Sequence, residues 1–132
     1  MELVAIVSML ALVECTFFGF RVGGMRGKYD VAAPATTGNE IFERYYRVHY
    51  NTLEQLIIFL PSLWVFGYYI GQYWAAGIGS IFLVGRILYY ITYIKDPDSR
   101  GPGMALSFIS SWILLLGALI GSVTSFVSSI SQ

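Results

Sequence analysis

A dense group of charged and polar side chains opens one of the hydrophobic stretches of this chain. Residues 43–54 read Glu-Arg-Tyr-Tyr-Arg-Val-His-Tyr-Asn-Thr-Leu-Glu, and the apolar run 56–60 follows almost at once. Ionisable side chains are costly at membrane depth, and those found there usually serve a ligand, an ion path or one another. This segment is therefore the first candidate for a binding site.

A helix over this segment would bring its polar residues to one face. At about 100° per residue, four side chains share that face: Glu43, Arg47, Asn51 and Glu54. His49 projects from roughly the opposite side. A later segment has a second polar face, formed by Arg86, Tyr89, Tyr90 and Tyr93. Depths estimated at about 1.5 Å per residue place both faces at one level, so we expect Glu54 to pair with Arg86.

The composition identifies the environment of these residues. Hydrophobic residues make up 56% of the 132 residues and charged residues only 12%, which is too apolar for a small soluble domain. Four apolar segments, at about residues 3–22, 41–70, 73–94 and 104–126, are each long enough to cross a hydrocarbon core of about 30 Å. Since lipid cannot satisfy backbone polar groups, these spans should be helices. We predict an all-α membrane protein with one domain over residues 1–132, packed as a left-handed bundle.

Three polar breaks separate the predicted spans. The first is a glycine-rich loop over residues 23–38, the second is a tight turn at residues 71–72, and the third is a polar loop over residues 95–103. All eight Lys and Arg residues flank the first and third breaks, so this side should be cytoplasmic and both termini should be external. A multi-pass protein of the bacterial inner membrane or of the endoplasmic reticulum fits this pattern.

Arginine is in excess on that side. Five arginines outnumber the acids that could reach them at that depth: Arg26, Arg44, Arg47, Arg86 and Arg100. Because the guanidinium fork matches carboxylates, the surplus predicts an anionic ligand, with phospholipid headgroups as a second class of anion. A structural ion-pair network that holds the helices together is the alternative. A formal net charge of zero gives no reason to expect nucleic acid, and no metal site is predicted.

At these residues the chain resembles the MAPEG family, the membrane-associated proteins of eicosanoid and glutathione metabolism. The matching pattern is Glu43-Arg44-x-x-Arg47-x-His49-x-Asn51-x-x-Glu54, then Phe59-Leu60-Pro61 and Trp64. It continues in Arg86-x-x-Tyr89-x-x-x-Tyr93 and in Arg100. The element Thr36-Thr37-Gly38 looks like the cysteinyl-leukotriene synthase branch. The resemblance covers the whole chain.

The resemblance implies a homotrimer of four-helix subunits that binds glutathione as co-substrate between neighbouring subunits, near the cytoplasmic side. The glutathione-binding residues that it implies are Arg26, Arg47, His49, Asn51, Glu54, Arg86, Tyr89 and Tyr93. Arginines suit the two carboxylates of glutathione, and Glu54 suits its ammonium group. Arg100 matches the arginine assigned to thiolate stabilisation, which makes it the catalytic candidate. A fixed cation favours the nucleophilic thiolate over the thiol.

The activity that the resemblance implies is conjugation of glutathione to hydrophobic electrophiles, with glutathione-dependent reduction of lipid hydroperoxides as a second activity. Three positions depart from cysteinyl-leukotriene synthase: Gly27 replaces a second arginine, His49 replaces a glutamine and Gln55 replaces a tyrosine. The specificity of that synthase for its fatty epoxide therefore does not follow, and a general transferase or peroxidase is the better reading.

Two other functions fit parts of the sequence. Small multidrug-resistance transporters also have four short spans and one glutamate inside the first, as Glu14 is here. A MAPEG-like protein with a structural or regulatory function and no catalysis is the other alternative. Turnover of a chloronitrobenzene with glutathione would separate the enzyme from both, and proton-coupled drug flux would identify the transporter.

Overall fold

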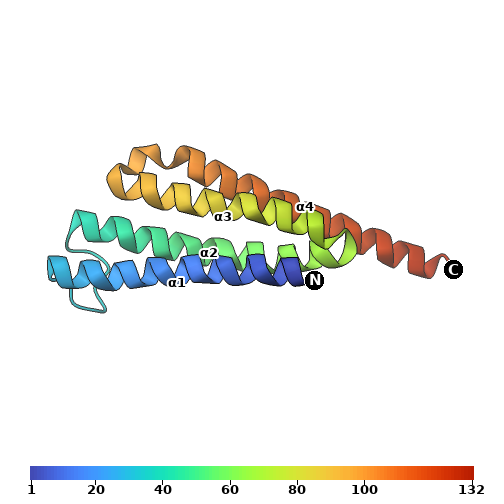
Figure 1. Cartoon of the computed structure of the whole chain (residues 1–132), viewed down its shortest axis with the longest axis horizontal. Helices are drawn as coiled ribbons and strands as arrows, with labels where there is room; N and C mark the ends of the chain where they lie inside the picture. The colour runs from blue at the N-terminus through green and yellow to red at the C-terminus, as the bar shows by residue number, and fades with distance from the viewer.

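The computed structural model describes all residues, 1–132, and is entirely helical. Four long helices follow one another in alternating directions: α1 (Glu2–Tyr29), α2 (Glu40–Tyr69), α3 (Gln72–Lys95) and α4 (Gly101–Ile130). A short 3₁₀ turn, η1 (Pro97–Arg100), joins α3 to α4. Figure 1 shows the α1–α2 loop and η1 at one end of the bundle and both termini toward the other. We call the end with these two connections the polar end.

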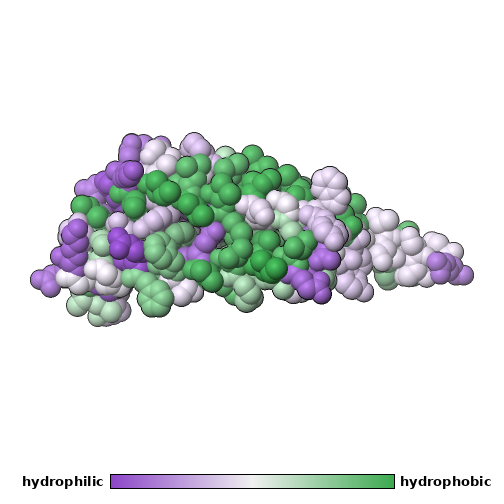
Figure 2. Space-filling model, viewed as in Figure 1, coloured by the Kyte–Doolittle hydropathy of each residue, from purple (hydrophilic) through white to green (hydrophobic).

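The surface agrees with an integral membrane protein. Three segments are long and apolar enough to cross a membrane: Glu2–Tyr29, Gln72–Lys95 and Pro97–Ile130. The second helix, α2, is 30 residues long, but its first half carries the charged segment described above. Figure 2 shows hydrophobic residues over the middle of the bundle and hydrophilic residues concentrated at the polar end. The predicted all-α membrane fold is confirmed.

The first predicted loop is wrong over its first part, because α1 continues through the glycines to Tyr29. Val22 and Met25 are buried there against Val31 and Phe42, and this packing outweighs the cost of about 1 kcal/mol for each interior glycine. The helix ends where Asp30 takes the left-handed conformation, with φ of 57°. The last helix also exceeds the predicted residues 104–126, since it begins at Gly101 and ends at Ile130.

An aromatic pair lies at the centre of the bundle core. The rings of Phe59 on α2 and Phe82 on α3 are stacked with centroids 3.8 Å apart, and neither side chain has exposed surface. They belong to a cluster of 12 buried residues that draws on all four helices. In lipid such packing, rather than exclusion of water, holds helices together.

The helices α3 and α4 touch through their backbones at two glycines. A Cβ atom added to Gly103 would lie 2.5 Å from the backbone nitrogen of Tyr89, and one added to Gly85 would lie 2.9 Å from the backbone nitrogen of Ser107. Small residues permit such close approach between membrane helices. This contact fixes the start of α4, and with it Arg100, beside Tyr89.

We therefore expect Gly103→Ala to destabilise the protein by about 1–3 kcal/mol, the usual cost of overpacking. The new methyl group meets backbone atoms, which cannot rotate away as a side chain can. Gly101→Ala is the matched control, because a Cβ atom there would meet nothing within 4 Å. Thermal unfolding in detergent, followed by circular dichroism, measures both. Equal melting temperatures for the two variants would contradict the close approach.

Candidate functional site

A polar pocket of about 410 Å³ opens near the polar end between α2, α3 and the start of α4. It is lined by Arg47, Tyr89, Tyr93, Arg100 and Met104. The structure thus brings together four of the residues that the sequence singled out, although they are up to 53 positions apart. Met104, one helical turn after Arg100, was not predicted.

The turn η1 presents Arg100 to this pocket. The Asp96 side chain accepts a hydrogen bond from the backbone of Asp98 at 3.1 Å, and the Ser99 hydroxyl donates to the carbonyl of Asp96 at 2.7 Å. These bonds close the turn locally. The Arg100 guanidinium makes one hydrogen bond in the protein, from Nη1 to the carbonyl of Pro97 at 3.2 Å. Most of its donors remain available to a ligand.

Glu54 forms an ion pair with Arg47 and not with Arg86. Nη1 of Arg47 lies 3.4 Å from Oε1 of Glu54, and both side chains are almost half exposed. The expected pair between Glu54 and Arg86 is therefore wrong. The two residues of α2 are seven positions apart and share one surface of the helix, whereas Arg86 is fully buried.

Neutral groups hold Arg86 beneath the pocket. Its Nη1 donates to Oδ1 of Asn51 at 2.7 Å, and its Nε donates to the hydroxyl of Ser107 at 3.0 Å. Its guanidinium carbon lies 4.5 Å from the centre of the Tyr89 ring, and Tyr89 stacks on Tyr93 with centroids 5.2 Å apart. Arg86 has no exposed surface, so it orients Asn51 and Tyr89 from below the pocket.

Two small hydroxyl residues, neither of them predicted from the sequence, complete the surroundings of Arg86. The hydroxyl of Ser107 donates a hydrogen bond to the carbonyl of Gly103 at 2.8 Å, so its oxygen can accept the hydrogen bond from Arg86. Thr52 accepts from Nη1 of Arg86 at 3.4 Å. The available signal was weak, because single Ser and Thr residues are common in membrane helices, where they bond to their own backbone.

Two predicted binding residues lie away from the polar pocket, on the α1 side of the subunit. Nη1 of Arg26 donates to the carbonyls of Ala35 at 2.7 Å and Val31 at 3.4 Å. Arg26 thus stabilises the α1–α2 loop. His49 packs against α1 at Gly19. A Cβ atom added to Gly19 would lie 3.1 Å from Nε2 of His49. The structure does not bring these two residues together with the residues of the polar pocket.

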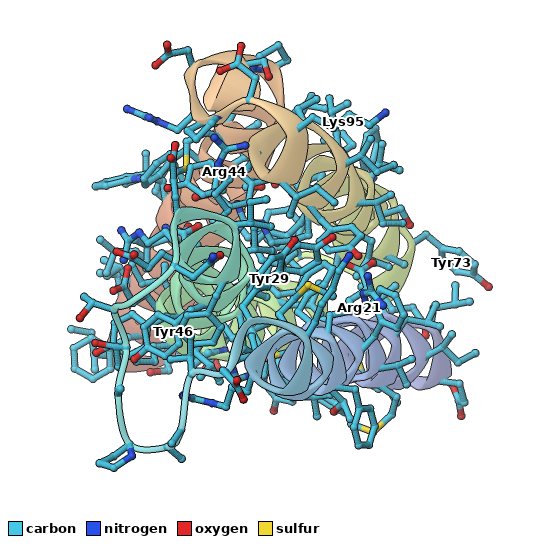
Figure 3. All side chains as sticks on the ribbon, turned by 90° about the vertical axis from the view of Figure 1, so that its left-hand side faces the viewer. Arg21, Tyr29, Arg44, Tyr46, Tyr73 and Lys95 are labelled. Carbon is cyan, nitrogen blue, oxygen red and sulfur yellow. The ribbon has the colours of Figure 1, made fainter.

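Arg44 closes the polar end of the bundle. Figure 3 looks onto this end and shows Arg44 between α2 and the chain that leads from α3 to α4. Its Nη1 donates to the carbonyls of Lys95 at 3.0 Å and Ile94 at 3.3 Å, and its Nη2 donates to Glu40 at 3.0 Å. This arginine therefore satisfies carbonyl groups at the end of α3, and is a structural residue.

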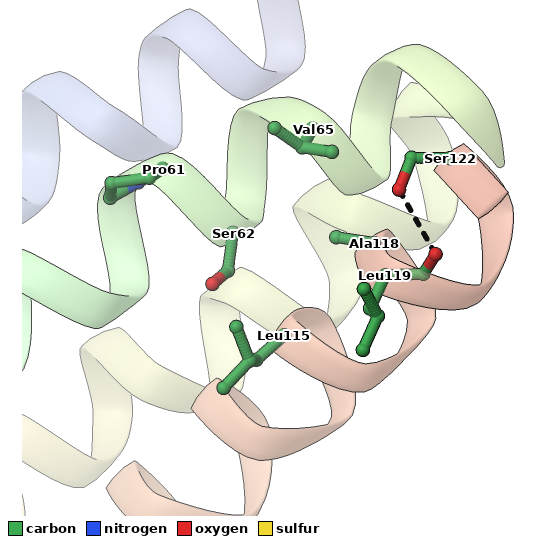
Figure 4. A pocket seen from close by; sticks show the side chains of 7 residues that line it. All are labelled: Pro61, Ser62, Val65, Leu115, Ala118, Leu119 and Ser122. Atoms are coloured by element: carbon green, nitrogen blue, oxygen red, sulfur yellow. Dashed lines mark hydrogen bonds between the residues drawn. The ribbon is translucent and has the colours of Figure 1, made fainter. Parts of the chain in front are cut away.

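A second pocket lies toward the opposite end, between α2 and α4 (Figure 4). Its volume is about 220 Å³, and no charged side chain lines it. The hydroxyl of Ser122 on its wall donates to the carbonyl of Leu119 in its own helix at 2.9 Å. No group of three or more His, Cys, Asp or Glu residues could hold a metal ion. The polar pocket is therefore the place where charged and hydroxyl groups converge.

The arrangement at the polar pocket suits a small anionic ligand. Two guanidinium groups, from Arg47 and Arg100, face one cavity with the aromatic hydroxyls of Tyr89 and Tyr93. Arginine binds carboxylates through paired hydrogen bonds, and a fixed cation stabilises a thiolate. Glu54 does not line the pocket, but its ion pair with Arg47 places a carboxylate next to it.

Known proteins are similar in sequence to this chain over nearly its whole length. The family model described as the MAPEG family matches residues 4–120. An uncharacterized protein of Synechocystis is 48% identical over 88% of this chain and 85% of its own. Human microsomal glutathione S-transferase 2 is 39% identical over 95% of this chain and 85% of its own. Guinea pig (Cavia porcellus) leukotriene C4 synthase is 32% identical over 98% of this chain and 87% of its own. The chain therefore belongs to the MAPEG family.

Proposed function

We propose that this protein is a membrane glutathione transferase, which binds glutathione in the polar pocket and conjugates it to hydrophobic electrophiles. The observation that carries the proposal is the convergence of Arg47, Arg100, Tyr89 and Tyr93 on one cavity. Two of its relatives are named as a glutathione S-transferase and as leukotriene C4 synthase, which supports the same chemistry. Glutathione is the co-substrate in this proposal, and membrane lipid surrounds the protein.

Each part of glutathione has a chemical partner at the site. Arg47 would bind a carboxylate, Glu54 would accept hydrogen bonds from the ammonium group, and Arg100 would stabilise the thiolate. The thiolate sulfur then forms a bond to an electrophilic carbon, and the electron pair of the broken bond goes to the leaving group. In the reduction of a lipid hydroperoxide, the same thiolate would bond to the outer peroxide oxygen as the O–O bond breaks and the lipid alcohol leaves. A second glutathione would then displace that oxygen as water and form the disulfide.

We further infer a homotrimer in which neighbouring subunits complete each site. Arg26 and His49 lie on the α1 side, away from the pocket formed by α2, α3 and α4. One subunit therefore presents two sets of polar residues in different directions. A ring would bring the α1 side of one subunit to the pocket of the next. The cation-rich polar end would face the cytoplasm by the positive-inside rule.

The proposed function predicts conjugation of glutathione to a chlorodinitrobenzene by the purified protein in detergent. The product is followed by its absorbance, with heat-denatured protein as the blank. Binding of glutathione without turnover would favour a structural or regulatory protein. Proton-coupled drug flux in liposomes, with no glutathione binding, would favour a transporter that uses Glu14.

Loss of Arg100 should affect the thiol more than the binding of glutathione. In Arg100→Ala we expect the pKa of the bound thiol to rise toward the solution value of about 8.5, and conjugation to slow accordingly. Affinity should change little, since Arg47 and Glu54 remain. The ultraviolet absorbance of the thiolate, measured against pH, gives the pKa. Lys95→Ala, which removes an exposed cation near the same turn, is the control. An unchanged pKa with full activity would remove Arg100 from the mechanism.

Loss of either member of the ion pair in α2 should weaken glutathione binding. We expect Arg47→Ala and Glu54→Gln each to lower affinity about tenfold to a hundredfold, because a charged hydrogen bond contributes about 1.5–3 kcal/mol. Calorimetric titration measures the affinity, and a melting curve on the same sample reports the fold. Lys28→Ala, at an exposed position of α1, is the control. Variants that melt earlier but bind normally would show a structural pair only.

The trimer predicts a detergent-corrected mass of three 14.7 kDa chains by light scattering. Glutathione binding should depend on this assembly, because Arg26 and His49 reach a site only across a subunit boundary. A monomer that binds glutathione with full affinity would contradict the shared site, while the transferase proposal itself would stand.

A further inference from the structure

Three charged side chains have a buried atom without a hydrogen-bond partner: Oε2 of Glu14, Nε of Arg44 and Nη2 of Arg86. Arg44 lies at the polar end and already pairs with Glu40, whereas Glu14 and Arg86 lie within the transmembrane part of α1 and α3. Arg86 is fully buried, its three partners are neutral, and no carboxylate lies within 4.0 Å of it. An unpaired charge in such surroundings is strongly unfavourable. The guanidinium group of Arg86 therefore has no direct contact with a carboxylate, although its buried charge requires a counterion.

The packing of α1 against α3 places Glu14 at the level of Arg86. On α1, Cys15 belongs to the same core cluster as Phe82 of α3, and Phe18 belongs to the same cluster as Tyr89 of α3. Glu14 lies within this packed stretch of α1, and Arg86 lies between Phe82 and Tyr89 on α3. Phe18 also stacks on Tyr90 of α3 with ring centroids 5.0 Å apart, and Glu14 and Arg86 each precede one of these two residues by four positions. Glu14 is therefore the acid that lies at the level of Arg86.

We propose that ordered water bridges Oε2 of Glu14 and Nη2 of Arg86, and that the resulting ion pair positions Asn51 for the polar pocket. The two residues form no direct salt bridge, and both atoms are polar, buried and without a hydrogen-bond partner. Buried water occupies such gaps, where it joins groups that would otherwise lack partners. The positioning of Asn51 rests on the proposed function; the water-bridged pair does not.

The path from Glu14 to the site runs through one guanidinium group. Water at Nη2 would fix the guanidinium plane from the α1 side, while Ser107 fixes Nε from α4. Nη1 then holds Oδ1 of Asn51 at 2.7 Å, which leaves the amide NH₂ of Asn51 for a second partner. Asn51 is only 3% exposed and is not among the residues that line the pocket, so its orientation depends on Arg86. Glu14 is a positioning residue in this scheme, since it acts through Arg86 and touches no substrate.

A double-mutant cycle tests the pair without any ligand. Glu14→Gln and Arg86→Gln should each lower the melting temperature, and the double variant should melt higher than the sum of the two losses predicts. Glu2→Gln, at an exposed acid of the same helix, should combine additively with Arg86→Gln. If Glu14→Gln does not fold, the double variant should regain folding. Additive losses, or failure of the double variant to fold, would overturn the pair.

Glutathione titration tests the positioning of Asn51. If the charge of Glu14 matters, Glu14→Asp should retain most of the affinity for glutathione, because an additional water can span the shorter side chain. Glu14→Gln should then bind glutathione at least about fivefold more weakly. If only shape matters, Glu14→Gln should bind better than Glu14→Asp, which would overturn the positioning by charge. Equal affinity in all three proteins would overturn it as well. A wild-type protein that binds no glutathione would refute the proposed function and the positioning together, while the thermal cycle still decides the pair.

Discussion

A fully buried arginine is the constraint around which the polar half of this bundle is built. Arg86 cannot lose its proton under ordinary conditions, and neutral side chains of α2, α3 and α4 surround it. Asn51 and Thr52 come from α2, and Ser107 comes from α4. The ring of Tyr89 covers its face. Removing one of these groups would leave a donor unsatisfied where water is scarce, which explains why polar residues of three helices converge at one depth.

The pocket inherits its shape from this arrangement and from the backbone contact between α3 and α4. Arg86 fixes Asn51 and Tyr89 from below, while Gly85 and Gly103 bring the start of α4 against α3. This contact fixes the position of the turn η1, which places Arg100 at the pocket. The cations that line the pocket sit at its rim and keep free donors, whereas the cation beneath it is bound internally. Location, more than charge, separates the residues proposed to contact a ligand from those that support them.

Much of this was predictable from the sequence. The apolar segments identified the helices, and the helical spacing of Arg47, Asn51 and Glu54 placed them on one face. The partner of Glu54 was not predictable, because matching depth cannot distinguish a side chain that points outward from one that points inward. The end of α1 was missed for a related reason: glycines weaken a helix, but the burial of Met25 and Val22 against Phe42 keeps it intact. Backbone contact at Gly103 also requires knowledge of which helices are neighbours.

The polar character of α2 has a consequence for how the chain enters the bilayer. The other three helices meet the criteria for spanning a membrane by their own composition, and α2 does not. A charged residue at the centre of a helix raises its insertion free energy by about 2.5–3.5 kcal/mol, so α2 partitions poorly as an isolated segment. The short connection at Gly71 links it directly to the apolar α3. Insertion as a hairpin would let α3 carry α2 into the membrane, and would couple biogenesis to the same polar residues that form the site.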